Sequence, residues 1–409
     1  MDRFLAVTSR EVDQVGGSVV YSREKHSAQF GHGSETDRWF PEAASTPISG
    51  RDPASQRSEV TMSEMVATKP AIPQSGGSEP LLEVAGLRVS YPSRNHEGER
   101  VPAVRQFDLR LAAGERVAIV GESGSGKSTV CLALAGFLSG PGVAIAANTF
   151  TVLGVDKTIS TTSGGLPRRR DGVAMMFQDA MTSLDPVSTV RSQFGAVLRA
   201  AGFARAERDA QARSWLRRVG LDEAERVLRA RPYELSGGMR QRVMLALAMA
   251  SRPRVLIADE PTSALDASLA REMMRLICDV VSEAGTALLV VTHDISLSRE
   301  FCDRMLVMYG GCVVEEGRST ELAAQPRHSY TDALLKSVPT LAHAAAWRLP
   351  TISPAPVPHP DIAADGCPFR FRCARRTALC ETMPDTSVCQ SDGADHLVRC
   401  WHPAHHAAA

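Results

Sequence analysis

The chain has 409 residues, which is more than one average domain and enough to bury a hydrophobic core. Hydrophobic residues make up 44% and charged residues 22%, so the composition excludes a wholly disordered or fibrous protein. Lys and Arg together number 46, as do Asp and Glu, and this balance excludes a general electrostatic attraction to nucleic acid or to an anionic membrane.

Residues 1–80 are rich in Ser, Gly, Thr and charged side chains, and their hydrophobic residues follow neither helical nor strand spacing. We therefore expect this N-terminal extension to be mostly disordered. Met62 and Met65 stand shortly before the first ordered pattern, which gives the hypothesis that the native protein starts near them. No hydrophobic run approaches the roughly 18 residues that span a bilayer and no signal segment is found, so we expect a cytoplasmic protein.

An ordered domain is expected over residues 81–345, in one copy because the chain shows no internal repeat. From about residue 115, hydrophobic strands alternate with helical patterns, which is typical of an α/β fold with a largely parallel sheet. Between about 180 and 250 the pattern is helical and rich in Arg, Glu and Ala, which predicts an inserted helical subdomain. The clearest strand patterns are Leu81–Val84, Val101–Leu111, Val117–Val120, Val255–Ala258 and Ala287–Val291.

The C-terminal part is expected to hold a stiff Pro-rich linker over 346–362, a Cys-rich module over 363–403 and a tail over 404–409. Four of the nine cysteines stand singly in hydrophobic surroundings and are expected to be buried: Cys131, Cys278, Cys302 and Cys312. The other five crowd the C-terminal end: Cys367, Cys373, Cys380, Cys389 and Cys400. In a reducing cytoplasm such a cluster favours metal ligation over disulfides.

A glycine-rich motif of the form G-x-x-x-x-G-K-[ST] lies between a strand pattern and a helical pattern. A phosphate-binding loop requires this order, because the glycines let backbone N–H groups turn toward phosphate oxygens at a helix N-terminus. We expect Lys127 to reach the β- and γ-phosphates and the Ser128 hydroxyl to bind Mg²⁺. The expected ATP contacts of this loop are Gly121, Glu122, Ser123, Gly124, Ser125, Gly126, Lys127, Ser128 and Thr129.

A pair of carboxylates forms a second motif. The strand pattern Val255–Ala258 ends in Asp259 and Glu260, and the carboxyl end of a strand lies beside the phosphate loop in such folds. Asp259 is placed to hold Mg²⁺, directly or through water, and Glu260 is placed to orient and polarise the attacking water. A strand that ends in Asp-Glu is commonplace by itself, but after a phosphate loop it predicts nucleotide hydrolysis.

The segment Leu235–Arg242, with the sequence LSGGMRQR, resembles the signature motif of ATP-binding cassette (ABC) proteins. Its Ser and Gly residues precede a helical pattern over 239–251, so their hydroxyl and N–H groups would form a second anion site. The resemblance implies an ABC-type phosphate-loop domain, with a RecA-like core and a helical subdomain. It also implies a head-to-tail dimer, in which the ATP held by one chain is contacted by the partner's copies of Ser236, Gly237, Gly238 and Gln241.

Four further positions match the same family. Tyr91 resembles the aromatic residue that stacks on adenine, and Gln178 resembles the glutamine that touches Mg²⁺ and the attacking water. Asp266 belongs to a segment similar to the loop that crosses the dimer interface, and His293 resembles the switch histidine that contacts the γ-phosphate. The resemblance thus implies the catalytic residues Lys127, Gln178, Glu260 and His293 and the Mg²⁺ ligands Ser128, Gln178 and Asp259.

Within this family, the chain is most similar to ATPase subunits of bacterial oligopeptide, dipeptide and nickel importers. The matching segments are Phe177–Pro186, Tyr233–Arg242, Tyr309–Gly317, His328–Thr331 and the closing cysteine region, within about 81–401. The resemblance implies an ATP-hydrolysing subunit that is peripheral on the cytoplasmic face of the inner membrane. It further implies a second ABC ATPase subunit, two polytopic permease subunits and, indirectly, an extracytoplasmic solute-binding protein, with no nucleic acid partner.

The cysteine cluster resembles the family's C-terminal motif, which binds a four-iron four-sulfur cluster in some members. The ligands that this resemblance implies are Cys367, Cys373, Cys380 and Cys400. Zinc also suits four thiolates, and the spacing of these residues fits neither common zinc fingers nor ferredoxins, so zinc and the absence of any metal stay open. The neighbouring residues that could replace or compete with a ligand are Cys389, His402, His405 and His406.

Two other classes of function stay open at this point. A soluble ABC ATPase that acts on ribosomes or DNA usually has two cassettes in one chain or long insertions, and the interval from Lys127 to Ser236 has neither. A nucleotide-binding regulator without hydrolysis would lack Glu260 or His293, and both are present. The residues do not identify the transported solute, nor do they indicate whether the partner cassette is a copy of this chain or a sister subunit.

Overall fold

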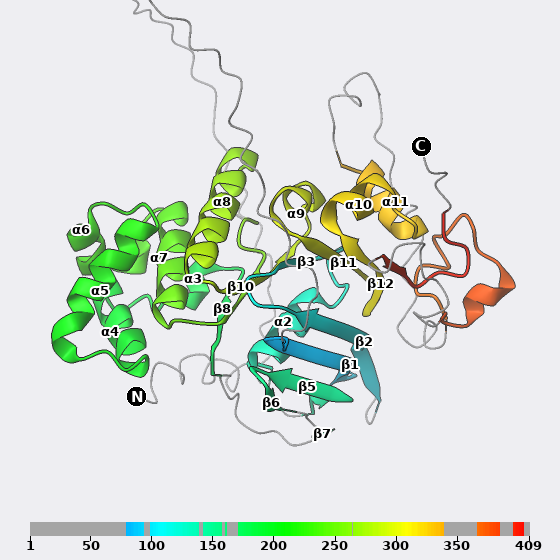
Figure 1. The fold of residues 1–409 in the computed structure, drawn as a ribbon, viewed down its shortest axis with the longest axis horizontal. Helices are drawn as coiled ribbons and strands as arrows, with labels where there is room; N and C mark the ends of the chain where they lie inside the picture. Colours follow the sequence, from blue (N-terminus) through cyan, green and yellow to red (C-terminus); the bar gives the residue numbers. More distant parts are fainter. Residues whose placement is uncertain are drawn as a thin grey trace, which may run out of the picture. The chain divides into compact units, whose positions relative to one another are not determined.

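The computed structural model describes residues 79–93, 99–138, 142–157, 160–161, 171–263, 265–338, 366–384 and 396–404 (Figure 1), all within one unit, Ile72–Ala409. Several expectations lie outside these residues: the extension over 1–78, the start near Met62, the linker over 346–362, and Cys389, His405 and His406. The division of the chain into domains therefore stays a prediction.

Five neighbouring strands form a parallel sheet in the order β11-β3-β10-β9-β8. Their side chains alternate between two cores: Leu256 and Ala258 face one core, whereas Val255 and Ile257 face the other. Because both faces are covered, these strands are continuous hydrophobic runs, as the sequence predicts. Their bounds are β3 (Arg116–Val120), β8 (Val173–Met176), β9 (Val255–Asp259), β10 (Ala287–Thr292) and β11 (Arg304–Tyr309).

The remaining strands pair in antiparallel fashion, apart from a single parallel bridge between β2 and β12, so the expectation of a largely parallel sheet holds for only part of the structure. Short connections explain the difference: β5 and β6 are joined by the turn Leu153–Gly154, and parallel pairing needs a long crossover. These strands are β1 (Leu82–Pro92), β2 (Arg100–Leu111), β4 (Ala144–Ala146), β5 (Thr149–Val152), β6 (Val155–Asp156), β7 (Ser160–Thr161), β12 (Cys312–Arg318) and β13 (Leu397–Val398).

Helices of the sheet domain pack on both faces of the parallel strands. The first, α2, starts directly after the glycine-rich loop and packs against β2 and β9, whereas α8 lies on β10. No helix among the described residues is long and hydrophobic enough to cross a membrane. The bounds are α2 (Lys127–Ala135), α8 (Ala267–Glu283), α9 (Ile295–Phe301), α10 (Ser319–Ala324) and α11 (Ser329–Lys336).

A group of helices, drawn in green in Figure 1, lies beside β8 and contacts it through α7. It occupies the range for which the sequence predicts a helical subdomain. The signature segment begins α7 at Gly237, two residues earlier than the helical spacing indicates, because Ser236 caps the helix. The bounds are α3 (Ala180–Ser183), α4 (Val190–Ala200), α5 (Arg205–Arg218), α6 (Ala224–Arg229), η1 (Pro232–Glu234) and α7 (Gly237–Ala250).

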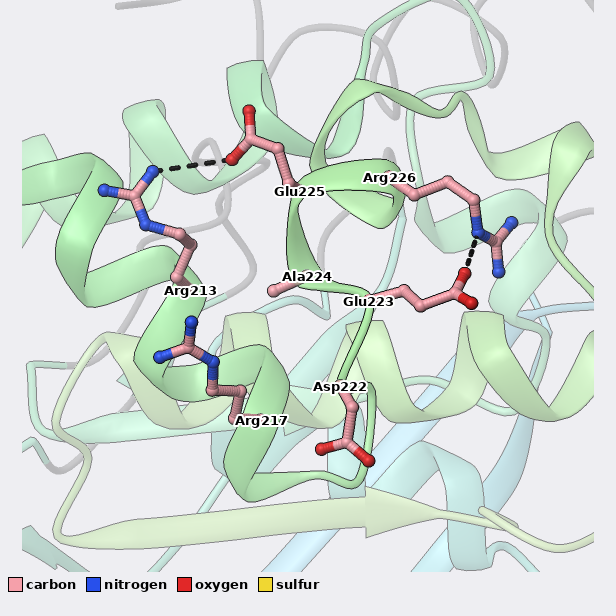
Figure 2. A pocket seen from close by; sticks show the side chains of 7 residues that line it. All are labelled: Arg213, Arg217, Asp222, Glu223, Ala224, Glu225 and Arg226. Carbon is pink, nitrogen blue, oxygen red and sulfur yellow. Dashed lines mark hydrogen bonds and ion pairs between the residues drawn. The ribbon is translucent and has the colours of Figure 1, made fainter.

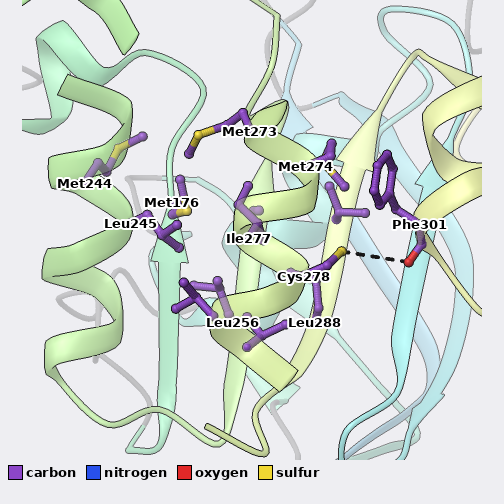
Figure 3. Packing of buried hydrophobic residues seen from close by; sticks show 14 of the residues in the cluster. Met176, Met244, Leu245, Leu256, Met273, Met274, Ile277, Cys278, Leu288 and Phe301 are labelled. Carbon is purple, nitrogen blue, oxygen red and sulfur yellow. Dashed lines mark hydrogen bonds between the residues drawn. The ribbon is translucent and has the colours of Figure 1, made fainter. Parts of the chain in front are cut away.

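One hydrophobic core joins this helical group to the sheet. Figure 3 shows side chains of α7, such as Met244 and Leu245, and side chains of α8 packed over Met176, Leu256 and Leu288 of three neighbouring strands. The buried residues of α8 recur every three or four positions, as an amphipathic helix requires: Ala270, Met273, Met274, Ile277, Cys278, Val280 and Val281. The core therefore fixes the helix that carries the signature motif against the sheet that carries the other motifs.

The register of the parallel strands determines where the functional residues meet. Val291 of β10 pairs with Asp259 of β9, and Thr292 pairs with Val120 of β3. Parallel strands end at the same edge of a sheet, so the segments that follow β3, β8, β9 and β10 leave the sheet side by side. The glycine-rich loop, Gln178, Glu260 and His293 all belong to these segments.

The C-terminal segments attach to the sheet domain through a buried carboxylate on β12. Glu315 is 1% exposed and accepts hydrogen bonds from the backbone N–H groups of Arg327 (2.6 Å) and His328 (3.0 Å). His396 Nε2 donates to the same carboxylate at 2.8 Å, and Glu315 also pairs with Val398 of β13. One side chain therefore joins β12, the turn before α11 and the C-terminal module.

We predict that Glu315→Ala lowers the free energy of unfolding by about 2–4 kcal/mol, because three N–H groups around a buried carboxylate lose their acceptor. Urea unfolding of the nucleotide-free protein measures this loss. Glu321→Ala, which removes an exposed carboxylate from α10, is the control and should change stability by less than about 0.5 kcal/mol. Equal effects of the two substitutions would contradict the assigned role of Glu315.

Candidate nucleotide-binding site

The loop from Gly121 to Thr129 has the backbone conformation of a phosphate cradle. Gly121, Gly124 and Gly126 have φ angles of 154°, 81° and 100°, which side chains other than glycine rarely allow. A Cβ atom at Gly126 would also lie 2.5 Å from the carbonyl oxygen of Ala103. The loop therefore needs glycine at these positions, and it delivers its N–H groups to the N-terminus of α2, where anions are favoured.

Lys127 occupies the centre of this loop. Its Nζ donates to the carbonyl oxygens of Gly121 and Glu122, at 2.8 Å each, and the residue is 5% exposed. Burial lowers the pKa of Lys127, although the carboxylates of Glu260 and Asp259 act in the opposite direction. An ammonium group that is held in the loop and poorly solvated can be stabilised by phosphate oxygens.

The first residues of α2 face the end of β9. Ser128 Oγ donates to Asp259 Oδ1 at 3.1 Å, and Asp259 is 5% exposed. Burial raises the pKa of Asp259, whereas the Ser128 hydrogen bond opposes that shift. A hydroxyl and a carboxylate are oxygen ligands that suit Mg²⁺, and a cation here would stabilise the buried carboxylate, so the two residues fit a magnesium site.

The side chains of Gln178, Glu260 and His293 meet beside Asp259, although each belongs to a different sequence motif. Gln178 Nε2 donates to Glu260 Oε2 at 3.1 Å, and His293 Nδ1 lies 3.6 Å from the same oxygen. Glu260 has a φ of 44°, a conformation that costs about 1–3 kcal/mol outside glycine and is concentrated at functional sites. Its backbone N–H donates to Val291 O at 2.9 Å, which fixes the carboxylate at the edge of the sheet.

Other expected residues lie at the borders of this group. The Tyr91 hydroxyl lies 3.4 Å from Thr129 Oγ1, so the aromatic ring is near α2 and the phosphate loop. Asp266 accepts the N–H groups of Ser268 and Leu269 at 3.0 Å and thereby caps α8, directly after the loop that follows Glu260. These contacts are compatible with the roles that the sequence suggests for Tyr91 and Asp266, and they do not test them.

The signature segment is placed differently from the other motifs. Ser236 accepts the N–H of Met239 at 3.3 Å, and its hydroxyl and Gly237 are exposed at the N-terminus of α7. Gln241 is 4% exposed, and its amide oxygen finds no hydrogen-bond partner among the described residues. Among the same residues, no hydrogen bond or ion pair joins Ser236 to the phosphate loop of its own chain.

Residues that sequence reasoning did not select also contact the phosphate loop. Arg372 forms an ion pair with the Glu122 side chain, and the Tyr330 hydroxyl accepts the Glu122 N–H at 2.8 Å. Arg372 is 250 residues away from Glu122. A local sequence pattern cannot indicate that two residues so far apart along the chain will pair, so only the folded structure could identify this contact.

A second candidate site lies in the C-terminal module, where four cysteines line one cavity: Cys367, Cys373, Cys380 and Cys400. Burial and the three neighbouring thiols raise the pKa of the Cys367 thiol to about 12. Three of the sulfurs accept a backbone N–H from the residue two positions later, with N···S distances of 3.4 Å at Cys373 and Cys400. No group of three His, Cys, Asp or Glu side chains in the described residues is close enough to hold a metal ion.

A pocket of about 480 Å³ lies on the helical group, between α5 and α6. Figure 2 shows that its charged side chains come from both helices and from the turn between them. Arg213 pairs with Glu225 at 3.5 Å, and Arg226 pairs with Glu223. The first pair joins α5 to α6 and the second lies at the start of α6, so both pairs stabilise the helical group.

The fold, the phosphate loop and the grouped acid, glutamine and histidine together define a phosphate-loop ATPase. Residues 104–263 match the family described as ABC transporter, and residues 314–380 match the oligopeptide/dipeptide transporter, C-terminal region.

Individual proteins extend this match over most of the chain. The probable D,D-dipeptide transport ATP-binding protein DdpD of Escherichia coli (strain K12) is 35% identical, over 80% of this chain and 98% of that protein. The oligopeptide transport ATP-binding protein AppD of Bacillus subtilis (strain 168) is 37% identical, over 78% and 96%. Among solved structures, the dimeric ATP-binding cassette MJ0796 with ADP and Pi is 27% identical over 58% of this chain and 98% of that one, with a TM-score of 0.49.

The chain therefore belongs to the ABC transporter family. The sheet topology confirms the α/β fold that the sequence predicts, and the family match confirms the ATPase class.

We predict that Lys127→Ala weakens ATP binding by roughly 10- to 100-fold and abolishes turnover, because charge-assisted hydrogen bonds to phosphate are lost. Binding of a fluorescent ATP analogue and phosphate release measure the two effects. Lys336→Ala is a matched control, since that ammonium is 60% exposed and pairs only at the surface with Asp332. ATP affinity retained in Lys127→Ala would contradict the proposed phosphate contact.

Proposed function

We propose that this chain is the ATP-hydrolysing subunit of a bacterial importer for dipeptides, oligopeptides or a related small solute. The observation that carries the proposal is the convergence of Gln178 and His293 on Glu260, beside the phosphate loop at one edge of the sheet. The peptide assignment is supported by the C-terminal region that this chain shares with oligopeptide and dipeptide transporters.

In this proposal, the phosphate loop holds ATP through its N–H groups and Lys127. Ser128 and Asp259 would hold Mg²⁺, which would supply positive charge to stabilise the phosphates. Glu260 accepts a proton from the attacking water and orients it toward the γ-phosphate. Gln178 and His293 hold the Glu260 carboxylate through the contacts described above, and His293 stabilises negative charge on the γ-phosphate.

The remaining part of the site comes from a second cassette. Ser236 and Gly237 are exposed at the N-terminus of α7, where hydroxyl and N–H groups favour an anion. Among the described residues no contact brings them to the chain's own loop, which supports closure on the ATP of a partner. Closure of the dimer on ATP and its opening after hydrolysis would move two permease subunits that dock near Gln178.

Attachment to the membrane would therefore be peripheral, through permease subunits at the cytoplasmic face of the inner membrane. A solute-binding protein outside the cell would deliver the solute to the permease. This assignment is supported by relatives whose names describe transport ATP-binding proteins.

We predict that Glu260→Gln retains ATP binding but lowers hydrolysis by about 10²-fold or more, because the amide is a poor general base. Light scattering should then detect an ATP-dependent dimer, formed by this chain alone or with its sister subunit. Uptake of a labelled dipeptide by cells that depend on this chain should be lost.

The control is Glu283→Gln, which changes an exposed carboxylate at the end of α8. Near-normal hydrolysis, or a strictly monomeric ATP-loaded variant, would overturn the proposal.

We further propose that the cysteine cavity holds a four-iron four-sulfur cluster, with Cys367, Cys373, Cys380 and Cys400 as ligands. The four cysteines line one cavity of the C-terminal module, and four thiolates are the ligand set that such a cluster takes. His328 also lines the cavity, and its buried Nε2 lacks a partner among the described residues, so a sulfur bound nearby could accept its N–H.

We predict that the chain purified without oxygen shows the broad visible absorption of an iron–sulfur cluster and contains about four irons. Cys373→Ala should lower both, because it removes one of the four thiolate ligands. Cys312→Ala, which removes a buried thiol outside the module, is the control and should retain them. Stoichiometric zinc, or no metal in the wild-type protein, would overturn this assignment and leave the ATPase proposal unaffected.

A further inference from the structure

We propose that the C-terminal module positions the phosphate loop through the ion pair between Arg372 and Glu122, and thereby sets the nucleotide affinity of this chain. The inference rests on the proposed nucleotide site and adds a positioning residue to it. It does not depend on which metal, if any, the module holds.

The ion pair is bidentate, and its guanidinium is sheltered from solvent. Arg372 Nη1 donates to Glu122 Oε2 at 2.9 Å, and Nη2 donates to Oε1 at 3.3 Å. The Arg372 side chain is 9% exposed and that of Glu122 is 32% exposed. Surface ion pairs contribute little because water solvates both partners, whereas a sheltered pair in this parallel geometry holds its groups in place.

Both partners are fixed by further contacts. The Arg372 guanidinium also donates to the Tyr309 hydroxyl at 3.2 Å, and the Tyr330 hydroxyl accepts the N–H of Glu122 at 2.8 Å. The rings of Tyr309 and Tyr330 pack on each other and on Phe369 of the module, with centroid distances of 4.6–5.4 Å. Three elements that are far apart in the sequence therefore meet at Glu122.

A second contact connects the module to the loop by another route. A Cβ atom added to Gly310 would lie 2.7 Å from Pro368, so the module packs closely against the turn between β11 and β12. The next residue, Gly311, donates its N–H to the carbonyl oxygen of Ser125 in the phosphate loop at 3.1 Å. The module thus supports the loop at Glu122 and, through this turn, at Ser125.

The charge of Glu122 explains why this support matters for binding. Glu122 places a carboxylate on a loop that receives a polyanion, and its carbonyl oxygen also accepts a hydrogen bond from Lys127. Arg372 neutralises that carboxylate and turns it toward the module. Without the guanidinium, the free carboxylate would repel the phosphates, and the loop would lose a restraint on its backbone.

The test measures the affinity for Mg·ADP, because the phosphate-loop contacts proposed for it come from one chain. Arg372→Gln should weaken binding about tenfold, or about 1.4 kcal/mol. When Arg372→Gln is introduced into the Glu122→Gln variant, the affinity should fall by less than about twofold, because no carboxylate remains to repel the nucleotide. The loss in Arg372→Gln should also shrink as salt is raised from about 0.05 M to 0.5 M, since it is electrostatic.

Arg376→Gln is the matched control in the same module, because that guanidinium is 45% exposed and pairs with Glu381 instead of the loop. It should leave the affinity unchanged. If Arg372→Gln unfolds, Arg372→Lys retains the charge and should recover most of the affinity. Equal losses in the two Glu122 backgrounds, or a loss independent of salt, would overturn the inference. Wild-type protein that bound no nucleotide would overturn the proposed function and this inference together.

Discussion

The parallel register of β8, β9, β10 and β3 is the constraint on which the rest of the structure depends. It brings the carboxyl ends of these strands to one edge, so segments separated by up to about 170 residues in the chain leave the sheet as neighbours. A shift of one strand by a single residue would exchange its two hydrophobic faces, and both faces are buried. Packing in the two cores thus helps to fix the positions of Gln178, Glu260 and His293.

The site that results holds two buried groups, Lys127 and Asp259, whose charged forms are poorly solvated. Burial lowers the pKa of Lys127 and raises the pKa of Asp259, so for each residue the surroundings oppose the charged form. A nucleotide with Mg²⁺ would bring phosphate oxygens to the ammonium group and a cation to the carboxylate. The site is therefore organised before its ligand arrives, and the interactions that the folded chain leaves incomplete are those that Mg·ATP can complete.

The sequence predicts those parts of the site that are local in the chain. The glycine loop, the Asp259–Glu260 pair and the buried strands are each recognised within a few residues, because strand spacing and turn chemistry are local properties. The antiparallel strands around β5 are missed because they are short and partly exposed. The pairing of Arg372 with Glu122 is missed for a stronger reason: spacing along the chain contains no record of which distant side chains will meet.

Two of the four cysteines and Arg372 belong to the same short turn, which hydrogen bonds hold in shape. The N–H of Arg370 donates to Cys367 O at 3.1 Å, and the N–H of Arg372 donates to Phe369 O at 2.9 Å. A group bound by Cys367 and Cys373 would therefore restrain the same backbone that presents the guanidinium to Glu122. Binding at the cysteine cavity would thus be connected to the phosphate loop through this one hydrogen-bonded turn.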